Sequence, residues 1–502
     1  MPHPSSPSSI PAVLTHSAFD WLRLLRERRI GAVELLNLHL SQLDHHNPSI
    51  NAVVERNLEA ALAAAWKADN TLPSARGPLH GLPMTIKDSF EVEGLPATCG
   101  FSFLGDHFPE RDADAVARLR SAGAIFYGKT NVPQGAFDWQ SYNSLYGTTN
   151  NPWNVARSPG GSSGGPAAAL AAGFTPLELG SDMGGSIRVP SLFCGVFGHK
   201  PSHGIVPSRG HIPPLPGNGE HLRLEMGVAG PMARSAVDLE LALDVLVGAD
   251  TQHSVAWQVR VPPSRHERLE DFRIALWAND DAFAVDAASR AAIESWADDL
   301  RRLGARIDTK ARPKIDWHAA YETYLTALLQ LLGIGASKTH VDQLIEEAQA
   351  GRAGAYTVRL ARALSLRHHE YFQIMLQREA ISRCWQEFFG DHDLFICPAF
   401  STVAYPHDQR GNELASPIAM GEQRTILVDG RHQPYFDGFQ WPSVATVADL
   451  PATAVPIGRF VEGLPMGVQV IGPRLEDRTP LRFAQLVEQA LGGFQPPPLL
   501  DA

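Results

Sequence analysis

Three segments of the sequence carry side chains that could act together as a nucleophile and its base. They hold Lys87 in LPMTIKDSF, Ser162 and Ser163 in SPGGSSGGP, and Ser186 in GSDMGGSIRVP. A serine hydroxyl is a weak nucleophile near neutral pH and needs an adjacent base. Burial beside the apolar run 84–86 would disfavour the ammonium form of Lys87 and lower its pKa, as base catalysis requires. These residues indicate acyl transfer through a serine, and they leave open which of the paired serines takes part.

The turn before the last serine could stabilise the charge that acyl transfer develops. It runs through Met183, Gly184 and Gly185, and glycine permits backbone angles that are closed to other residues. Successive backbone N–H groups there could form an oxyanion hole for a tetrahedral intermediate. Asp182 and Arg188 flank this turn, and we expect them to form an ion pair that holds it rather than to bind substrate.

An α/β framework must position these segments. Short apolar strands are predicted at 84–86, 124–127 and 177–180, and further strands in LFICPAF, TAVPIG and MGVQVIGP. Helices are predicted in 17–44, divided at Gly31, at about 112–122, in GGPAAALAAG, and at about 480–490. The segment from about 286 to 390 is mostly helical. The alternation predicts an α/β fold with helices on both faces of the sheet, and it leaves the strand order open.

Composition excludes several classes of function. The chain has 502 residues, and its net charge of -11 is spread without a long run of one sign, which argues against nucleic acid or an anionic membrane as partner. No apolar run approaches the ~18–20 residues of a membrane span. The start, MPHPSSPSSIPAV, has no signal-peptide pattern, so we expect residues 1–16 to be a flexible tail of a cytoplasmic protein.

Neither the cysteines nor the histidines are spaced for a metal site. Cys99, Cys194, Cys384 and Cys397 fit no zinc or redox motif, and we expect buried free thiols. The histidine pairs at 45–46 and 368–369 have no further ligand at a familiar spacing. We therefore expect no metal.

A different class of function is suggested by GAIFYGKT, residues 123–130, which matches the phosphate-loop pattern of nucleotide-binding proteins. The residues in and around this segment disfavour a phosphate loop. Residues 124–127 suit a pleated strand better than an anion-binding bend, and a helix rather than a strand precedes them. Pro133 also restricts the backbone where the nucleotide-binding helix should run. We expect a buried strand in AIFY, a turn in GKTNVPQ, and a structural or surface role for Lys129.

Long stretches of the chain together resemble the amidase signature family of hydrolases. The resemblance covers about 77–473, through GPLHGLPMTIKD, GKTNVPQ, NPWNVARSPGGSSGGPAAALAAGF, LGSDMGGSIRVPSLFCGVFGHKPSHG, LPATAVPIG and GLPMGVQVIGP. The 24 positions from Ser162 to Ser186 agree with the family's spacing between its catalytic serines. The resemblance implies one large domain, 17–502, with a central, mixed and twisted β-sheet covered by helices on both faces.

The resemblance also implies roles for the site residues. Ser186 would be the acylated nucleophile, Ser162, after a cis peptide bond, would relay a proton, and Lys87 would be the base. Ser163 would help to hold the loop, and no cofactor would be needed. Met183 stands where the family often has Thr; an oxyanion hole that uses the backbone N–H is expected to tolerate this change.

The resemblance leaves two functions open. The first is an amidase that releases ammonia or an amine from a small carboxamide. The second is the A subunit of a glutamyl-tRNA amidotransferase complex, against which Val189 stands where that subunit typically has Gln. Ala136, Phe137 and Trp139 in NVPQGAFDWQSYN suggest an apolar or aromatic acyl group, and the helical segment 286–390 could shape a substrate funnel. A homodimer is the default expectation for such an enzyme.

Overall fold

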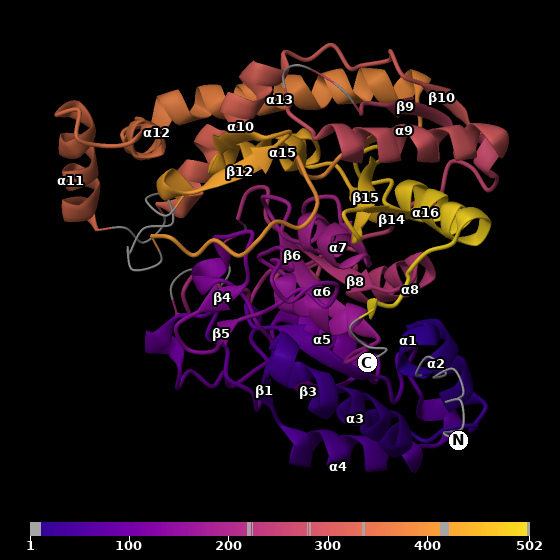
Figure 1. Cartoon of the computed structure of the whole chain (residues 1–502). Helices are drawn as coiled ribbons and strands as arrows, with labels where there is room; N and C mark the ends of the chain where they lie inside the picture. Colours follow the sequence, from indigo (N-terminus) through magenta and orange to yellow (C-terminus); the bar gives the residue numbers. More distant parts are fainter. Residues whose placement is uncertain are drawn as a thin grey trace, which may run out of the picture.

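The computed structural model describes residues 12–217, 222, 224–278, 280, 283–333, 337–411 and 421–498. Its main sheet has eight strands in the order β10-β9-β11-β15-β14-β7-β8-β6 and is flanked by helices (Figure 1). The strands are β6 (Leu177–Asp182), β7 (Phe197–Lys200), β8 (Val228–Ala233), β9 (Arg273–Leu276), β10 (Arg306–Asp308), β11 (Leu394–Cys397), β14 (Ala452–Val461) and β15 (Leu464–Ile471). Strands β10, β9 and β11 run parallel and the other neighbours antiparallel, so the sheet is mixed, as the family resemblance implies.

A second sheet of three strands lies beside the first. Its order is β1-β3-β2, with β1 (Val53–Arg56) antiparallel and β2 (Pro83–Lys87) parallel to the central β3 (Ile125–Thr130). Strand β2 packs against β6, the edge strand of the main sheet. All residues of β2 and β3 are buried, so these strands show no alternation of polar and apolar side chains. This arrangement places the ends of β2 and β6 next to each other.

Two of the N-terminal helices, α3 (Ala32–Ile50) and α4 (Leu58–Asp69), pack against the three-stranded sheet. Another two, α2 (Ala18–Arg26) and α5 (Asp114–Ser121), pack against helix 236–246. Ser17 caps α2 and Gly31 stands at the start of α3, as the sequence predicts. The prediction that residues 1–16 form a flexible tail needs a correction for residues 12–15. Residues 1–11 lie outside the described residues, but α1 (Ala12–Thr15) is a helix whose Val13 and Leu14 are buried, because these apolar side chains pack into the core.

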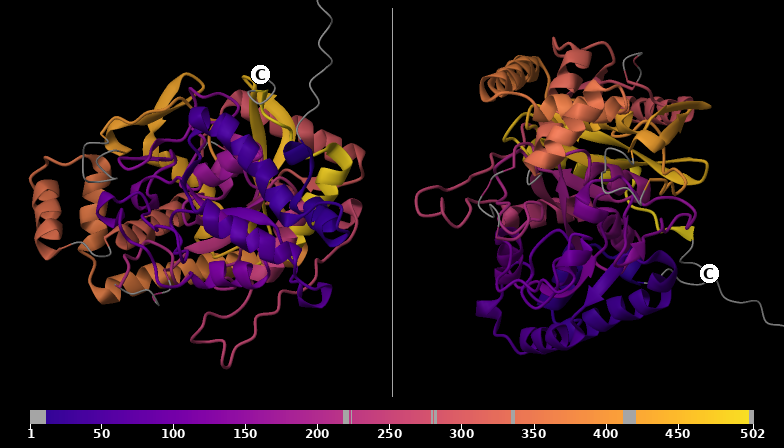
Figure 2. Two further views of the ribbon diagram at one scale, coloured as in Figure 1. Left: turned by 90° about the horizontal axis from the view of Figure 1, so that it is seen from below. Right: turned by 90° about the vertical axis from the view of Figure 1, so that its left-hand side faces the viewer.

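The segment 286–390 is mostly helical, as predicted. It contains α9 (Ala287–Arg302), α10 (Trp317–Leu332), α11 (Lys338–Gln349), α12 (Ala355–Leu364) and α13 (His368–Asp391), with the short β10 between the first two. In Figures 1 and 2 these helices, coloured rose to orange, lie on the opposite side of the molecule from the indigo α3 and α4, and α11 and α12 project at one edge. Most strands of the two sheets therefore lie between these two groups of helices (Figure 1).

The remaining elements are short, apart from helices that pack against strands of the two sheets. They are α6 (Gly164–Ala171), α7 (Arg188–Cys194), α8 (Ala236–Leu246), α15 (Gln440–Thr446), α16 (Arg478–Leu491), β4 (Tyr142–Asn143), β5 (Gly147–Thr148), β12 (Thr425–Val428), β13 (Arg431–Pro434), and the 3-10 turns Pro73–Ala75, Ser102–Leu104, Gln134–Ala136, Leu269–Asp271 and Tyr435–Phe439. Within the described part of the chain, no helix is both long and apolar enough to cross a membrane.

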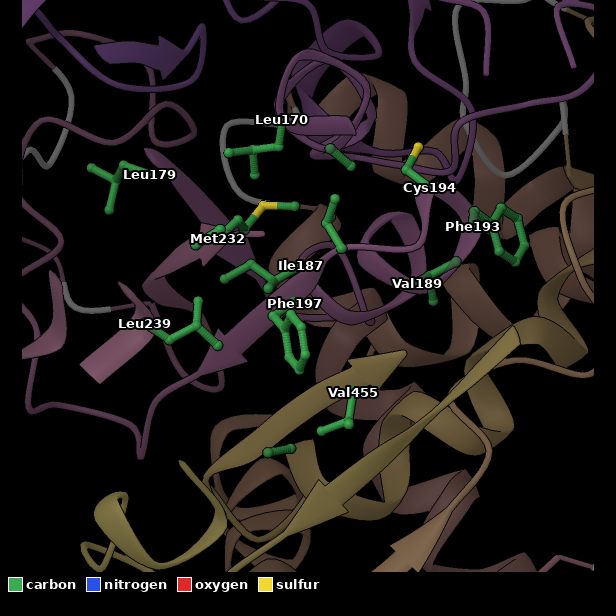
Figure 3. Packing of buried hydrophobic residues seen from close by; sticks show 14 of the residues in the cluster. Leu170, Leu179, Ile187, Val189, Phe193, Cys194, Phe197, Met232, Leu239 and Val455 are labelled. Carbon is green, nitrogen blue, oxygen red and sulfur yellow. The ribbon is translucent and has the colours of Figure 1, made fainter. Parts of the chain in front are cut away.

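The apolar core reaches directly behind the serine segments. Helices α6 and α7 follow the loops that hold Ser162 and Ser186, and every residue of both helices is buried. Ile187, next to Ser186, packs near Met232 of β8 and Phe197 of β7 (Figure 3). Because a close-packed interior resists displacement, this core fixes the backbone that carries the serines.

Candidate active site

Lys87 lies at the end of β2 and reaches two serine hydroxyls. Its Nζ is 2.7 Å from Oγ of Ser162 and 2.9 Å from Oγ of Ser181. The side chain has no solvent exposure. Burial lowers the pKa of Lys87 to about 7, because removal from water disfavours the ammonium form. A lysine with this pKa can accept a proton near neutral pH.

The two neighbouring serines have different surroundings. The Gly161–Ser162 peptide bond is cis, and the Ser162 hydroxyl faces Lys87. The N–H of Ser163 donates to the carbonyl oxygen of Ser186 at 3.0 Å, which ties the glycine-rich loop to the turn that holds Ser186. The sequence left these serines equivalent, and the structure brings the first of them to the lysine.

An ion pair holds the turn before Ser186, as predicted. Arg188 donates to both carboxylate oxygens of Asp182, from Nη2 at 2.8 Å and Nε at 3.1 Å, and both side chains are buried. Burial raises the pKa of Asp182, but the charge and hydrogen bonds of Arg188 outweigh it and bring the pKa to about 2. The carboxylate also accepts the N–H of Gly185 at 3.0 Å and that of Ile187 at 3.0 Å.

Neighbouring side chains fix the peptide groups of the predicted oxyanion hole. The carbonyl of Met183 accepts from the Tyr324 hydroxyl at 3.2 Å, and that of Gly184 accepts from Trp139 Nε1 at 3.0 Å. In a trans peptide the following N–H points the opposite way. The N–H of Gly184 therefore points away from Tyr324, whereas the N–H of Gly185 is directed to Asp182.

Ser162, Ser181 and Ser186 line one cavity of about 760 Å³, and Ser186 is partly exposed there whereas Ser162 is buried. Most of the wall is apolar. It includes Phe101, Phe103, Ala136, Phe137, Trp139, Leu215, Leu222, Leu224, Leu325, Leu328, Leu329, Leu331, Leu332, Phe436 and Phe439. The segment 136–139 and helix α10 therefore supply wall residues, and the selection of an apolar acyl group stays a prediction.

The described wall of this cavity carries little available charge. It includes no lysine or arginine, and its carboxylates are Asp138 and Asp182. Asp138 pairs with Arg424 at 2.6 Å, and Asp182 pairs with Arg188, so both carboxylates are neutralised by buried guanidinium groups. A ligand in this cavity would meet apolar surface, the imidazole of His211 and the hydroxyls of four serines, since Ser208 also lines the wall.

Sequence reasoning missed two residues of this site. Ser181 stands on β6 and accepts from Lys87, and its position at a strand end next to the turn was a signal that could have found it. His211 comes from the segment between β7 and β8, and its Nε2 lies 2.9 Å from Oγ of Ser181. No spacing or periodicity marked His211, because only the folded chain brings it to β6.

Lys129 has a structural role, which removes the basis of the hypothesis that GAIFYGKT binds a nucleotide. Residues 128–130 belong to β3, not to a turn as expected, because they pair with β1 and β2 on either side. The buried Nζ of Lys129 lies 3.1 Å from Oδ1 of Asp88 and donates to the carbonyl oxygens of Phe90 and Pro96. A lysine held in this way inside a sheet does not face a phosphate.

The cysteines and the metal-ligating side chains form no further site in the described residues. Cys99, Cys194 and Cys397 are buried, Cys384 is partly buried, and all four are free thiols, as expected. No group of three or more His, Cys, Asp or Glu side chains is arranged to hold a metal ion in the ranges that the structure covers.

Comparison with known proteins gives relatives along almost the whole chain. Fatty-acid amide hydrolase 2-A of Danio rerio is 30% identical, with 97% of this chain and 90% of that protein aligned. The A subunit of glutamyl-tRNA(Gln) amidotransferase from Methylococcus capsulatus is 32% identical, with 93% and 95% aligned. A solved structure described as an amidase superposes with a TM-score of 0.74 at 26% identity, over 95% of this chain and all of that one.

The family model named Amidase matches residues 34–481, which include Lys87 and both serine segments. With this match and these relatives, the chain belongs to the amidase family and is a hydrolase of amide C–N bonds.

Proposed function

We propose that this protein is an amidase that hydrolyses an uncharged, largely apolar amide through Ser186, Ser162 and Lys87. One observation carries the proposal: a buried lysine with a lowered pKa contacts a serine hydroxyl at the wall of a large apolar cavity that a second, partly exposed serine shares. The products would be a carboxylic acid and ammonia or an amine. No metal or organic cofactor takes part in this scheme.

The proposed reaction has two acyl-transfer steps. Ser186 attacks the amide carbonyl carbon while Ser162 accepts the proton of Ser186 and passes its own proton to neutral Lys87. The tetrahedral oxyanion is stabilised by N–H groups of the turn 183–186 other than that of Gly185, which donates to Asp182. The proton then returns through Ser162 to the leaving nitrogen, the C–N bond breaks, and water releases the acid from acylated Ser186 by the same relay.

The cavity supports an apolar substrate. Burial of apolar surface stabilises a complex by about 25 cal/mol per Å², so a substrate gains most where leucine and aromatic side chains enclose it. A zwitterionic substrate would lose hydration without gaining a charged partner here, since both wall carboxylates are paired. The name of the Danio rerio relative, a fatty-acid amide hydrolase, agrees in kind with this inference.

The second candidate is the A subunit of a glutamyl-tRNA amidotransferase, which the 32% identical relative supports. Such a protein would release ammonia from an amide donor and would act within a complex. Glutamine carries two charged groups that need partners, and the described cavity wall offers none that is unpaired. We therefore place this candidate second.

A panel of amides tests the proposal. The purified protein is incubated with aliphatic primary amides of increasing chain length, aryl amides, and glutamine or asparagine, and ammonia or amine release is followed. We expect kcat/KM to rise with apolar size and to be lost in Ser186→Ala. Release confined to glutamine and asparagine would instead favour the amidotransferase candidate, and no release from any amide would contradict both.

A further inference from the structure

His211 extends the hydrogen-bond network of Lys87 beyond the three residues of the proposed mechanism. Its Nδ1 lies 3.0 Å from the carbonyl oxygen of Pro213, and its Nε2 lies 2.9 Å from Oγ of Ser181. A carbonyl oxygen can only accept, so Nδ1 must carry the proton of this contact. In a neutral imidazole the other nitrogen is then an acceptor, and Nε2 can only receive a proton from Ser181.

This tautomer determines the direction of every hydrogen bond around Ser181. A serine hydroxyl has one proton, and that of Ser181 is directed to Nε2 of His211. Its oxygen is therefore left to accept from Lys87, whose Nζ is 2.9 Å away. Lys87 in its neutral form has two N–H groups and one lone pair, and it donates one N–H to Ser181.

Base catalysis requires the lone pair on Nζ of neutral Lys87, because this lone pair accepts the proton. The described residues give Nζ two hydrogen-bond partners, Ser162 at 2.7 Å and Ser181 at 2.9 Å. Were the Ser181 hydroxyl free to rotate, it could donate to that lone pair and compete with the proton of Ser162. With the Ser181 proton held by His211, the lone pair is available to Ser162.

We propose that His211 is a positioning residue: by accepting the proton of Ser181 it keeps the lone pair of Lys87 directed to Ser162. His211 acts through Ser181 and transfers no proton itself. This inference rests on the proposed function, because it presumes that Lys87 is the base. It adds a determinant of the base's orientation from a position outside the family motifs quoted above.

The surroundings keep His211 in the required neutral form. Burial and, to a smaller extent, the nearby charge of Lys87 lower the pKa of His211 to about 4, while the hydrogen bond to Pro213 acts in the opposite direction. The ring of Phe90 packs edge-on against it, with centroids 4.9 Å apart. His211 thus remains an acceptor across the range in which Lys87 gains and loses its proton.

Two substitutions of His211 distinguish the effect of its hydrogen-bond acceptor from the effect of its ring shape. His211→Phe keeps a planar ring but removes the acceptor, whereas His211→Gln retains a side-chain oxygen that can accept from Ser181. The readout is the rate constant with which a fluorophosphonate probe modifies Ser186, which depends on activation of the nucleophile and not on the identity of the natural amide. His107→Phe, which alters a histidine beside Glu91 and outside this network, is the control.

We expect His211→Phe to slow labelling about tenfold, a part of the roughly 10²–10⁴-fold that a positioned base contributes. His211→Gln is expected to stay within about threefold of the parent, since it keeps the acceptor. In the Ser181→Ala background, where no proton competes, His211→Phe should cause no further loss. Equal labelling of His211→Phe and the parent, or effects that multiply with Ser181→Ala, would overturn the inference.

A second measurement does not depend on how the variants fold. The nitrogen-15 spectrum of the imidazole in the parent protein at pH 7 should show His211 protonated at Nδ1, and the opposite tautomer would overturn the inference. The proposed function fails separately: a parent protein that labels at Ser186 but hydrolyses no amide contradicts the amidase proposal and leaves the role of His211 intact.

Discussion

Two buried lysines on neighbouring strands have opposite electrostatic surroundings. Lys87 contacts two neutral hydroxyls, and burial lowers its pKa to about 7. Lys129 contacts the carboxylate of Asp88 and two carbonyl oxygens. Since only a neutral amine can accept a proton, Lys87 is suited to act as a base and Lys129 to act as a structural cation.

The pH dependence of the reaction should report Lys87. Raising the pH through about 7 removes the proton from Lys87, so kcat/KM should rise with a midpoint near pH 7. Initial rates of amide hydrolysis between pH 5 and 10 would measure this. Lys87→Met should lose roughly 10²-fold or more at all pH values. A midpoint near the ordinary lysine pKa would show that burial does not tune this group.

Replacement of Lys129 should affect stability. Lys129→Met leaves the buried carboxylate of Asp88 without its cation, which we expect to lower the free energy of unfolding by about 3–5 kcal/mol. Denaturant unfolding would measure the change. The double variant with Asp88→Asn should recover part of it. An unchanged stability would contradict the structural role of Lys129. Binding of an ATP analogue that is lost in Lys129→Met would favour the interpretation of GAIFYGKT as a phosphate loop.

The sequence was enough to nominate Lys87, Ser162 and Ser186, because each stands in a conspicuous local pattern: the lysine at the end of an apolar run, and the serines in glycine-rich loops. Ser181 and His211 could not be assigned in this way. Their contact joins positions 30 residues apart through β6 and a loop with no regular pattern, and only tertiary packing determines it.

At the scale of elements, the turn before Ser186 depends on a conformation that favours glycine. Gly185 has φ +94°, and a Cβ there would lie 2.8 Å from Cγ of Pro442 and 2.9 Å from Cγ2 of Val189. Gly304 has the same φ of +94°, but a Cβ would meet only Cβ of Glu270 at an ordinary 3.4 Å. A comparison of substitutions at Gly185 and Gly304 therefore separates the effect of backbone strain from the effect of displacing the turn.

Gly185→Ala and Gly304→Ala should differ in activity more than in backbone strain. Both should lose about 1 kcal/mol of stability from the left-handed backbone angle. Only Gly185→Ala should also move the peptide groups beside Ser186, and we expect at least a tenfold loss of kcat, as removal of an oxyanion donor gives 10²–10³-fold. Thermal unfolding and steady-state rates measure the two effects, and equal activity of both variants would contradict the role of the turn.

Helix α10 should determine which amides enter the cavity. Leu329 lies in its wall, and Leu329→Trp would fill part of the volume. We expect KM to rise for long or bulky amides and to change little for short ones, as measured on a chain-length series. Leu376→Trp, at an exposed position of α13, is the control. An equal effect on all chain lengths would show that α10 does not select by size.

The prediction of elements succeeded where the local pattern is strong. Strands β11, β14 and β15 are largely apolar, as is the first half of β3, and the helices of 286–390 have amphipathic stretches. Strands β7, β8 and β9 were not predicted; β7 contains glycine, histidine and lysine, and its burial comes from pairing with β14 and β8. Strand order could not be predicted, since β7 pairs with a strand some 250 residues further along the chain.

At the scale of the whole molecule, one site is assembled from segments spread over the chain. Lys87 comes from the three-stranded sheet, Ser181 from the end of β6 and Ser186 from the turn after it. Parts of the cavity wall come from α10 and the 3-10 turn at 435–439. The single domain and the match to 34–481 agree with this assembly. A homodimer stays a prediction, and sedimentation equilibrium should give twice the mass of the chain; a monomer mass would contradict it.

The central claim is that Ser186 is a nucleophile activated by Lys87, and covalent labelling tests it most directly. The parent protein is treated with a fluorophosphonate at pH 8, and the modified residue is identified by peptide mass spectrometry. We predict one label on Ser186, no label in Ser186→Ala, and strongly slowed labelling in Lys87→Met. Equal labelling of Ser186→Ala and the parent, or a label on another residue, would contradict the account.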